Sequence, residues 1–408
     1  MVNRIMLNQT SYHGAGAISE LPTEVKSRGL KKALICCGPT LLRHGVIARV
    51  TDVMDAAGLS YEIYSDIKPN PTIENVTDGV AAFKAAGADY LIAIGGGSPM
   101  DTSKAIGIII NNPEFADVRS LEGVADTKKP CVPIIAIPTT AGTAAEVTIN
   151  YVITDTEKNR KMVCVDVHDI PVVAVVDPEM MASMPKGLTA ATGMDALTHA
   201  IEGYITKAAW EMSDMFHLKA IEIISKNLRG AVANTPEGRE GMALGQYIAG
   251  MGFSNVGLGI VHSMAHKTGA AFADYGAHII HGAANAMYLP KVIAFNAKDE
   301  TAKKRYGEIA DFMKLGGNTL DEKVELLIAH LRRMNDDLNI PHCIKNYGAD
   351  SFPTEQGFVP EEVFLERLPE IAANAILDAC TGSNPRQPSQ EEMEKLLKCC
   401  YYDTEVDF

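Results

Sequence analysis

Short apolar runs alternate with helix-like segments between residue 30 and about residue 180, and this alternation limits the folds that the chain can adopt. The runs of strand length are residues 33–37, 61–64, 90–94, 131–137 and 172–176, and helical periodicity appears over residues 41–57, 75–86 and 101–110. Such alternation is typical of β-α-β units, which build a parallel sheet covered by helices. It predicts an α/β domain in the first part of the chain.

The alternation ends near Met184-Pro185. Beyond this point the strand-like runs disappear, and long Ala- and Met-rich helical stretches continue through Leu397. A chain of 408 residues is long enough for two domains, because single domains usually hold ~100–200 residues. We therefore predict an α/β domain over residues 1–184 and an all-α domain over residues 185–408.

Charge and composition exclude several classes of protein. Lys and Arg number 37 against 51 Asp and Glu, and a net charge of −14 disfavours nucleic acids and anionic membranes as partners. The N-terminal residues lack the apolar core of a signal peptide, and the longest apolar runs, such as 106–110 and 172–176, are far shorter than a membrane helix. The eight cysteines include two adjacent pairs and no C-x-x-C motif, which indicates reduced thiols. We expect a cytoplasmic protein.

Three glycines and a serine, Gly95-Gly96-Gly97-Ser98, separate an apolar run from a helix-like segment. Without Cβ atoms, the backbone N–H groups of such a turn can approach a pyrophosphate, and a helix N-terminus adds partial positive charge. The motif is neither G-x-G-x-x-G nor a Walker A sequence, and alone it is also compatible with a tight turn that binds nothing. Residues 137–143 follow another apolar run and supply threonine hydroxyls for a phosphate or ribose. Together the two stretches predict a Rossmann-like dinucleotide-binding domain.

Histidine is concentrated in one short segment. The chain has 11 histidines, and four of them fall between residues 262 and 281: His262, His266, His278 and His281. His262 and His266 share a helical face because they are four residues apart, and Asp195 and His199 repeat this spacing on another expected helix. A lone Asp-x-x-x-His is commonly a surface hydrogen-bonded pair, but the density of histidines favours a metal site. One carboxylate with several imidazoles suits Fe²⁺, Zn²⁺ or Mn²⁺.

Four stretches of the chain resemble the iron-dependent (group III) alcohol dehydrogenases. They are residues 95–104 (GGGSPMDTSK), 138–148 (PTTAGTAAEVT), 191–204 (ATGMDALTHAIEGY) and 257–266 (GLGIVHSMAH). The resemblance extends from Asn3 to the segment CTGSNPR at residues 380–386, and it is strongest to the lactaldehyde reductase (propanediol oxidoreductase) branch. It implies an N-terminal dinucleotide-binding domain, a helical metal-binding domain and a homodimer.

The same resemblance assigns roles to individual residues. It implies that Asp195, His199, His262 and His281 bind Fe²⁺, or Zn²⁺ in some preparations, with His278 as the alternative fourth ligand. It makes His266 the catalytic histidine near the nicotinamide. The cofactor NAD(H) or NADP(H) is expected at Gly38, Asn70, Gly96, Gly97, Ser98, Asp101, Thr139, Thr140, Thr143, Asn150 and Lys161. The substrate is expected near Asn150, Phe253, Leu258 and Cys380.

Gly38 departs from the pattern of the family. It follows the strand-like run 33–37, where NAD-specific members of this branch carry an Asp that binds the adenosine ribose. An acidic group at this place repels a 2′-phosphate. Its absence predicts that NADPH is accepted, with Arg43, Lys31 or Lys32 reaching the phosphate. The chain also carries extra residues between 266 and 281 and near 351–359, which leaves the size of the substrate open.

The reaction that the resemblance implies is reversible hydride transfer between NAD(P)⁺ and a small primary alcohol or diol. The metal acts as a Lewis acid on the alcohol, and His266 relays the proton. Lactaldehyde and 1,2-propanediol are the expected pair, and 1,3-propanediol or butanol are the alternatives. A metal-dependent lyase of the same architecture needs Lys and Arg for acidic substrates, and the helical half around the histidines is nearly free of them.

Overall fold

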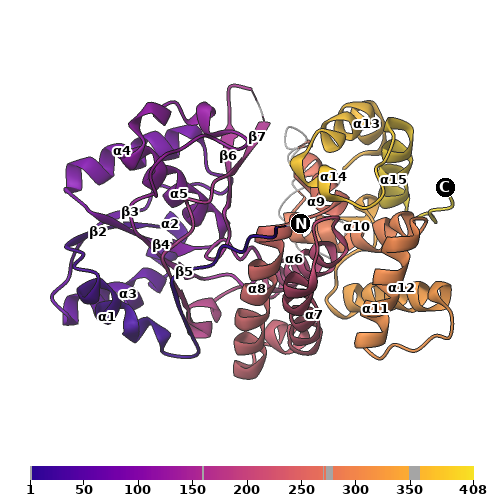
Figure 1. The fold of residues 1–408 in the computed structure, drawn as a ribbon, viewed down its shortest axis with the longest axis horizontal. Helices are drawn as coiled ribbons and strands as arrows, with labels where there is room; N and C mark the ends of the chain where they lie inside the picture. The colour runs from indigo at the N-terminus through magenta and orange to yellow at the C-terminus, as the bar shows by residue number, and fades with distance from the viewer. Residues whose placement is uncertain (1, 159, 270, 273–278, 349–358) are drawn as a thin grey trace. The chain divides into compact units, whose positions relative to one another are not determined.

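The computed structural model describes residues 2–158, 160–269, 271–272, 279–348 and 359–408. The chain divides into two compact units, Met1–Met184 and Pro185–Phe408 (Figure 1). The first unit is built around a parallel sheet and the second is helical, which confirms the fold class predicted from the sequence.

A six-stranded parallel sheet forms the centre of the first unit, in the order β1-β8-β5-β4-β2-β3. Strands β4, β5 and β8 are buried along their whole length, as expected for a parallel sheet covered on both faces. The strands are β1 (Thr10–His13), β2 (Lys32–Cys36), β3 (Ser60–Tyr64), β4 (Tyr90–Gly95), β5 (Ile134–Pro138) and β8 (Val173–Val176).

Helices cover both faces of this sheet (Figure 1). On one face, α4 (Ile73–Ala86) and α5 (Gly97–Asn111) pack against Leu34 and Leu91. On the other face, α1 (Leu21–Ser27) and α3 (Val46–Ala56) belong to the core that contains Ile35 and Ile92. Neighbouring residues of β2 and β4 enter opposite cores because successive side chains of a strand alternate between its faces. Since β4 and β5 are parallel neighbours, the turns that follow them lie at the same edge of the sheet.

Some local features of the first unit differ from the sequence-based expectation. Residues 41–57 do not form one helix: α2 (Pro39–Arg43) and α3 are separated by Gly45, whose φ of 74° lies in the left-handed region and interrupts the helical path. A two-stranded antiparallel sheet of β6 (Asn150–Asp155) and β7 (Arg160–Val165) was not expected from the sequence. Buried residues alternate with more exposed ones along these strands, which therefore lack the continuous apolar runs of the central strands.

In the described part of the second unit, every regular element is helical. The elements are α6 (Lys186–Ile205), α7 (Glu211–Val232), α8 (Pro236–Val256), α9 (Ile260–Thr268), α10 (His281–Asn296), α11 (Glu300–Phe312), α12 (Leu320–Asp337), α13 (Glu361–Ile376), α14 (Ala379–Ser383) and α15 (Gln390–Tyr402). None of the helices in the described ranges combines the length and the apolar character that a membrane crossing requires.

Helix α6 is the central element of the second unit. It is buried almost without interruption from Thr189 to Ile205 and contacts α7, α8 and α10. The approach of α10 depends on Gly282, because a Cβ at this position would lie 2.0 Å from the carbonyl oxygen of Ala191 on α6. This close contact brings the first turn of α10 against the middle of α6.

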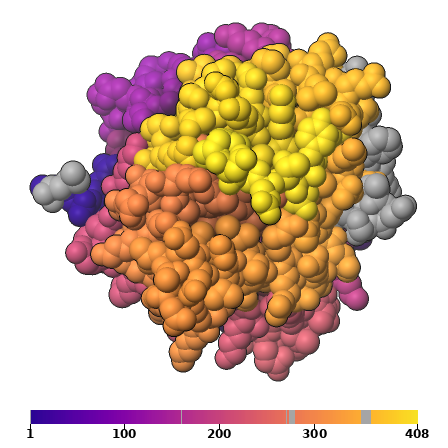
Figure 2. Space-filling view, turned by 90° about the vertical axis from the view of Figure 1, so that its right-hand side faces the viewer, coloured from indigo at the N-terminus to yellow at the C-terminus, as the bar shows by residue number. Residues whose placement is uncertain are grey.

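The C-terminal residues pack onto the helices of the same unit. Figure 2 shows them in yellow against the orange helices. The carboxylate of Asp403 lies 2.8 Å from both Lys291 on α10 and Arg332 on α12. The ring of Phe408 contacts Phe295, with 6.2 Å between the ring centroids. The end of the chain is therefore packed against the helical unit rather than being a free tail.

Candidate metal centre

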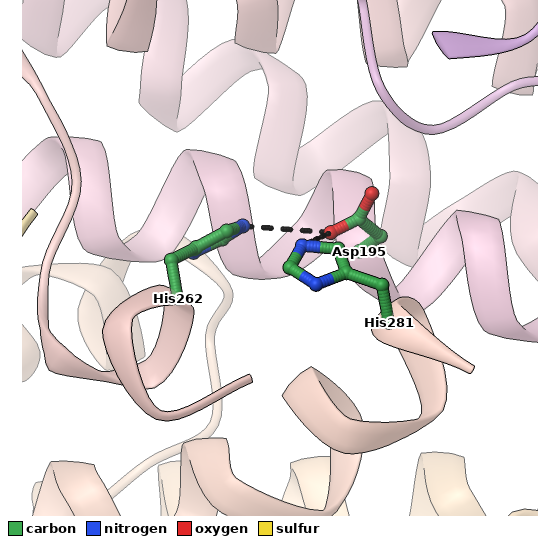
Figure 3. Close-up of side chains that lie close together, drawn as sticks. All are labelled: Asp195, His262 and His281. Atoms are coloured by element: carbon green, nitrogen blue, oxygen red, sulfur yellow. Dashed lines mark ion pairs between the residues drawn. The ribbon is translucent and has the colours of Figure 1, made fainter. Parts of the chain in front are cut away.

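Three side chains from three helices converge in the second unit (Figure 3). Oδ1 of Asp195 on α6 lies 3.4 Å from Nε2 of His262 on α9 and 3.6 Å from Nε2 of His281 on α10. Nε2 of His199, one turn after Asp195, lies 3.8 Å from the same oxygen. Because i, i+4 residues share a helical face, the Asp195–His199 spacing directs both side chains to the same region. One carboxylate oxygen is thus surrounded by three imidazole nitrogens.

These groups differ in their exposure to solvent. Asp195, His199 and His262 are buried, whereas the side chain of His281 is 35% exposed. The ring of His199 lies between two others, stacked on Phe253 at 4.1 Å and on His262 at 4.5 Å between centroids. The cluster therefore has a packed side and an accessible side, and His281 lies on the accessible one.

The surroundings of Asn285 test whether the cluster suits a cation. Nδ2 of Asn285 donates to Oδ1 of Asp195 at 2.7 Å and lies 3.2 Å from Nε2 of His262 and 3.3 Å from Nε2 of His281. A positively polarised group thus occupies the point that the donor atoms face. Neutral imidazoles and one carboxylate are the ligands that divalent iron and zinc prefer. The residues present therefore fit a divalent transition metal.

The electrostatics of the cluster agree with this interpretation. Burial alone would raise the pKa of Asp195, but the imidazoles of His199, His281 and His262 outweigh burial and hold that pKa well below its usual range. Burial alone would lower the pKa of His262, but its hydrogen bonds to Asp195 and Glu202 raise it to about 9. The cluster without metal thus retains a carboxylate and attracts positive charge.

A second group of possible ligands lies beside the first. His266, Asp378 and Cys380 bring their ligand atoms within 4.8 Å of one another, and the ring of His266 stacks on His281 with 5.3 Å between centroids. Here the ammonium of Lys267 lies 2.9 Å from Oδ2 of Asp378 and already neutralises the carboxylate. Within the described ranges, the ion pairs of Asp195 are with histidines alone. The Asp195 cluster is therefore the better cation site.

The first unit has a cradle of small residues and hydroxyls where β4 and β5 end. The N–H of Thr139 donates to the carbonyl of Gly95 at 2.9 Å and joins the two turns. A Cβ on Gly96 would lie 3.1 Å from the side chain of Thr140, so glycine is needed for this approach. Oγ1 of Thr140 is buried and finds no hydrogen-bond partner among the described residues. The α5 N-terminus beside it offers unpaired N–H groups, which suits a phosphate.

Comparisons with known proteins match this combination over nearly the whole chain. The family model "Iron-containing alcohol dehydrogenase" matches residues 8–178, and "Fe-containing alcohol dehydrogenase family, C-terminal" matches residues 189–401. Lactaldehyde reductase of Escherichia coli (strain K12) is 55% identical over 398 residues, which cover 97% of this chain and 99% of that protein. The chain belongs to the iron-containing alcohol dehydrogenases.

Two further relatives of this alcohol dehydrogenase support the assignment. NADPH-dependent butanol dehydrogenase of Clostridium saccharobutylicum is 41% identical, with 99% of this chain and 100% of that protein covered. The crystal structure of a 1,3-propanediol oxidoreductase superimposes with a TM-score of 0.90 at 34% identity, covering 98% of this chain and 100% of the other. Membership of the family makes the chain an oxidoreductase of alcohols and aldehydes with a metal and a nicotinamide cofactor.

The remaining cofactor residues expected in this dehydrogenase are distributed over the first unit. Gly38 precedes α2, Asn70 adopts a left-handed φ of 54° before α4, and Asp101 on α5 accepts the N–H of Val152 at 3.0 Å. Gly97 and Ser98 form the first turn of α5, Thr143 accepts the N–H of Ala145, and Asn150 and Lys161 lie on β6 and β7. Of all the cofactor residues expected from the sequence, five lie close together at the ends of β4 and β5: Gly96, Gly97, Thr139, Thr140 and Thr143.

The expected substrate residues of the dehydrogenase are placed in both units. Phe253 on α8 contacts His199, Cys380 on α14 lies in the His266 group, and Leu258 is buried between α8 and α9. Asn150 belongs to the first unit, where its carbonyl accepts a hydrogen bond from Lys104 at 2.8 Å. His278, the alternative fourth ligand, lies outside the described residues.

Three polar residues of the centre were missed by the sequence analysis: Glu202, Asn285 and Asp378. Glu202 accepts from Nδ1 of His262 at 2.6 Å, and Asp378 lies 3.1 Å from Nδ1 of His266. Glu202 follows Asp195 by seven positions and Asn285 follows His281 by four, so helical spacing could have identified both. Asp378 precedes the short helix α14 and carries no such signal.

Proposed function

We propose that this alcohol dehydrogenase catalyses the reversible reduction of lactaldehyde to 1,2-propanediol. The observation that carries the proposal is the cluster of Asp195 and three imidazoles in a chain whose 55% identical relative is a lactaldehyde reductase. Butanol or 1,3-propanediol is the second candidate, because relatives with those activities in their names align over nearly the full chain.

The metal of this proposal is Fe²⁺, which Zn²⁺ can replace. Its ligands are Asp195, His199, His262 and His281. When bound, such an ion supplies Lewis acidity, which lowers the pKa of an alcohol and polarises an aldehyde carbonyl. The packing of His199 between Phe253 and His262 fixes one side of the ligand set. The partly exposed His281 leaves the other side open to a small substrate.

His266 is the proton relay of the proposed reaction. Its Nδ1 faces Oδ2 of Asp378 at 3.1 Å, so the proton on Nδ1 is held by the carboxylate and Nε2 is left to exchange a proton. The pKa of Asp378 is held well below its usual range, because His266 and Lys267 outweigh the effect of burial, and the carboxylate stays charged. A bound nicotinamide cofactor would supply the hydride for the reduction of the carbonyl, and His266 would return a proton from solvent to the oxygen.

The turns after β4 and β5 would hold the pyrophosphate of the nicotinamide cofactor. NADPH would be accepted as well as NADH, because Gly38 has no acidic side chain that would repel a 2′-phosphate. Arg43 at the end of α2 is the cation proposed for the 2′-phosphate. Lys32 is a weaker candidate, since its ammonium pairs with Glu62 at 3.2 Å. The NADPH-dependent relative supports this part of the proposal.

The proposed enzyme works in the cytoplasm as a homodimer without nucleic-acid or membrane partners. Free thiols at all eight cysteines are consistent with a reducing compartment. The net charge of −14 is consistent with a small-molecule enzyme that avoids polyanions. Light scattering of the purified protein measures the oligomeric state directly.

One assay tests the proposed reaction. The protein is reconstituted with Fe²⁺ or Zn²⁺ without oxygen, and oxidation of NADH and NADPH is followed with lactaldehyde, glycolaldehyde, propionaldehyde and butyraldehyde. We expect the highest kcat/KM with lactaldehyde. Asp195→Ala and His262→Ala should abolish turnover and weaken metal binding strongly, whereas His342→Ala, which removes a histidine paired with Asp336, should change neither turnover nor metal binding. Retention of metal and rate in both site variants would refute the assignment.

A further inference from the structure

Glu202 contacts the start of α9 at several points. It lies on α6 and is 1% exposed. Its carboxylate accepts the backbone N–H groups of Gly259 at 3.1 Å, Val261 at 2.8 Å and His262 at 3.4 Å. The same carboxylate lies 2.6 Å from Nδ1 of His262. One buried group thus holds both the backbone and the ring of His262.

The local sequence explains why α9 needs a partner from another helix. Its N-cap residue is Gly259, which has no side chain to cap the first N–H groups. A Cβ at this position would lie 2.7 Å from Oε1 of Glu202, so glycine also makes the approach possible. Oδ1 of Asn384 accepts the N–H of Ile260 at 3.3 Å and completes the cap. A negative charge is also favourable at the positive end of a helix.

The contact with the ring has a separate consequence for the metal centre. Because Nδ1 of His262 donates a hydrogen bond to the carboxylate of Glu202, Nε2 is the ring nitrogen left for a metal, and Nε2 is the atom that faces Asp195 at 3.4 Å. When a carboxylate fixes the tautomer and orientation of a ligating histidine, its mutation commonly lowers metal affinity by about 10- to 100-fold. We propose that Glu202 is a positioning residue that sets the affinity of the centre for its metal by orienting His262. This inference rests on the metal site proposed above.

The competing explanation is that Glu202 only caps α9. Removal of the carboxylate should lower the stability of the fold under either explanation, so the melting temperature of a variant cannot distinguish them. Metal affinity can distinguish them, because the imidazole of His262 would still bind the metal normally if Glu202 only capped α9. Asp403 offers a matched control: it is a carboxylate of the same unit whose two cationic partners, Lys291 and Arg332, do not belong to the metal site.

The experiment measures chelator competition for Zn²⁺ on the full-length, zinc-loaded protein and its variants. We expect Glu202→Gln to bind Zn²⁺ about 10- to 100-fold more weakly than the wild type. Asp403→Asn should lower the melting temperature with unchanged Zn²⁺ affinity. In the His262→Ala background, Glu202→Gln should cause no further loss, because the residue acts through His262. If Glu202→Gln does not fold, Glu202→Asp, which keeps the carboxylate, replaces it in the same measurements. We then expect a smaller loss of Zn²⁺ affinity.

The outcomes separate this inference from the proposed metal site. If His262→Ala leaves Zn²⁺ affinity unchanged, the proposed site is wrong. If His262→Ala weakens Zn²⁺ binding while folded Glu202 variants bind as the wild type does, the positioning role is refuted and Glu202 is a helix cap only. An equal additional loss from Glu202→Gln in the His262→Ala background also refutes it, because the effect then does not pass through His262.

Discussion

Nδ1 of His266 lies 3.1 Å from Oδ2 of Asp378, a carboxylate that comes 112 positions later in the chain. The same oxygen lies 2.9 Å from the ammonium of Lys267. A histidine oriented by a carboxylate keeps one tautomer, and the pair can pass a proton without a large change in structure. The arrangement gives the proposed proton relay a fixed geometry.

Replacing Asp378 by Asn should therefore lower kcat by at least about tenfold. The amide cannot hold the Nδ1 proton of His266 with a full negative charge, and Lys267 loses its partner. Steady-state assays with NADH and the preferred aldehyde measure the effect, together with metal content. Asp336→Asn, which alters the pair with His342 instead, is the control and should leave kcat unchanged. A normal kcat in Asp378→Asn would contradict the relay.

Introducing Asp at Gly38 should shift the cofactor preference toward NADH. Two like charges about 4 Å apart repel by about 1 kcal/mol in water and more in a protein. The ratio of kcat/KM for NADPH over NADH should thus fall at least about tenfold. The space exists, because a Cβ at Gly38 would meet only the carbonyl oxygen of Ile67, at 3.4 Å. If the wild type uses NADH alone and excludes NADPH, the interpretation of Gly38 fails.

Arg43→Ala should raise the KM for NADPH and leave the KM for NADH near its wild-type value. The reason is that only NADPH carries the phosphate that Arg43 is proposed to contact. Steady-state kinetics with each cofactor measure the two KM values. Equal changes for both cofactors would place Arg43 outside the phosphate contact.

Thr140→Val should weaken cofactor binding without loss of stability. The buried hydroxyl of Thr140 has no partner among the described residues, so removing it costs the free protein no hydrogen bond. A lost hydrogen bond to the cofactor is worth about 1 kcal/mol, or roughly three- to tenfold in Kd. Fluorescence titration with NADH and a thermal melt measure the two quantities. Unchanged NADH affinity would show that the hydroxyl does not contact the cofactor.

His217 should make the folded protein sensitive to acid. Its ring is fully buried on α7, and neither nitrogen has a partner among the described residues. Burial, with Arg305 and His199 nearby, lowers the pKa of His217 to about 3. In the unfolded chain, the imidazole of His217 has its ordinary pKa near 6.5 and binds a proton at a higher pH than in the folded protein. The free energy of unfolding therefore falls as the pH drops below about 6.5.

His217→Leu tests this linkage. The wild type should lose about 2 kcal/mol of unfolding free energy between pH 7 and pH 5 through this residue, and the variant should lack that part of the slope. Urea unfolding at both pH values measures it. The exposed His44 is the matched control, and His44→Gln should keep the wild-type slope. An identical slope in His217→Leu would show that another group is responsible.

The general architecture was predictable because it depends on local patterns. Continuous apolar runs predicted the buried parallel strands, and the glycine-rich stretch was correctly predicted to lead from a strand into a helix. The predicted turn was too long, because Gly95 ends β4 and Gly97 and Ser98 already belong to α5. The break at Gly45 was not predicted, because a glycine in a helical pattern can be tolerated or can end the helix, and only its φ decides. The β6–β7 pair was missed because its strands are only half buried and carry no continuous apolar run.

The candidate centre was predictable only in part, for a similar reason. Asp195 and His199 share a helix, so their spacing along the sequence was informative by itself. Asp378 reaches His266 from a distant part of the chain, and nothing in a single sequence records that contact. The family resemblance supplied His281, whose nearness to Asp195 depends on the contact of Gly282 with α6. That these residues bind metal stays a prediction until metal content and affinity are measured.

The metal ligands proposed around Asp195 come from α6, α9 and α10, and this has a consequence for biosynthesis. A chain that emerges from the ribosome completes the unit Met1–Met184 before any of the proposed ligands has been made, and N-terminal domains generally fold first during synthesis. His281 is the last of the four to appear, and it begins the helix that completes the cluster. The nucleotide-binding half can therefore mature co-translationally, whereas capture of the ion must wait until most of the helical half has been synthesised. A supply of metal late in expression should then be sufficient to load the enzyme.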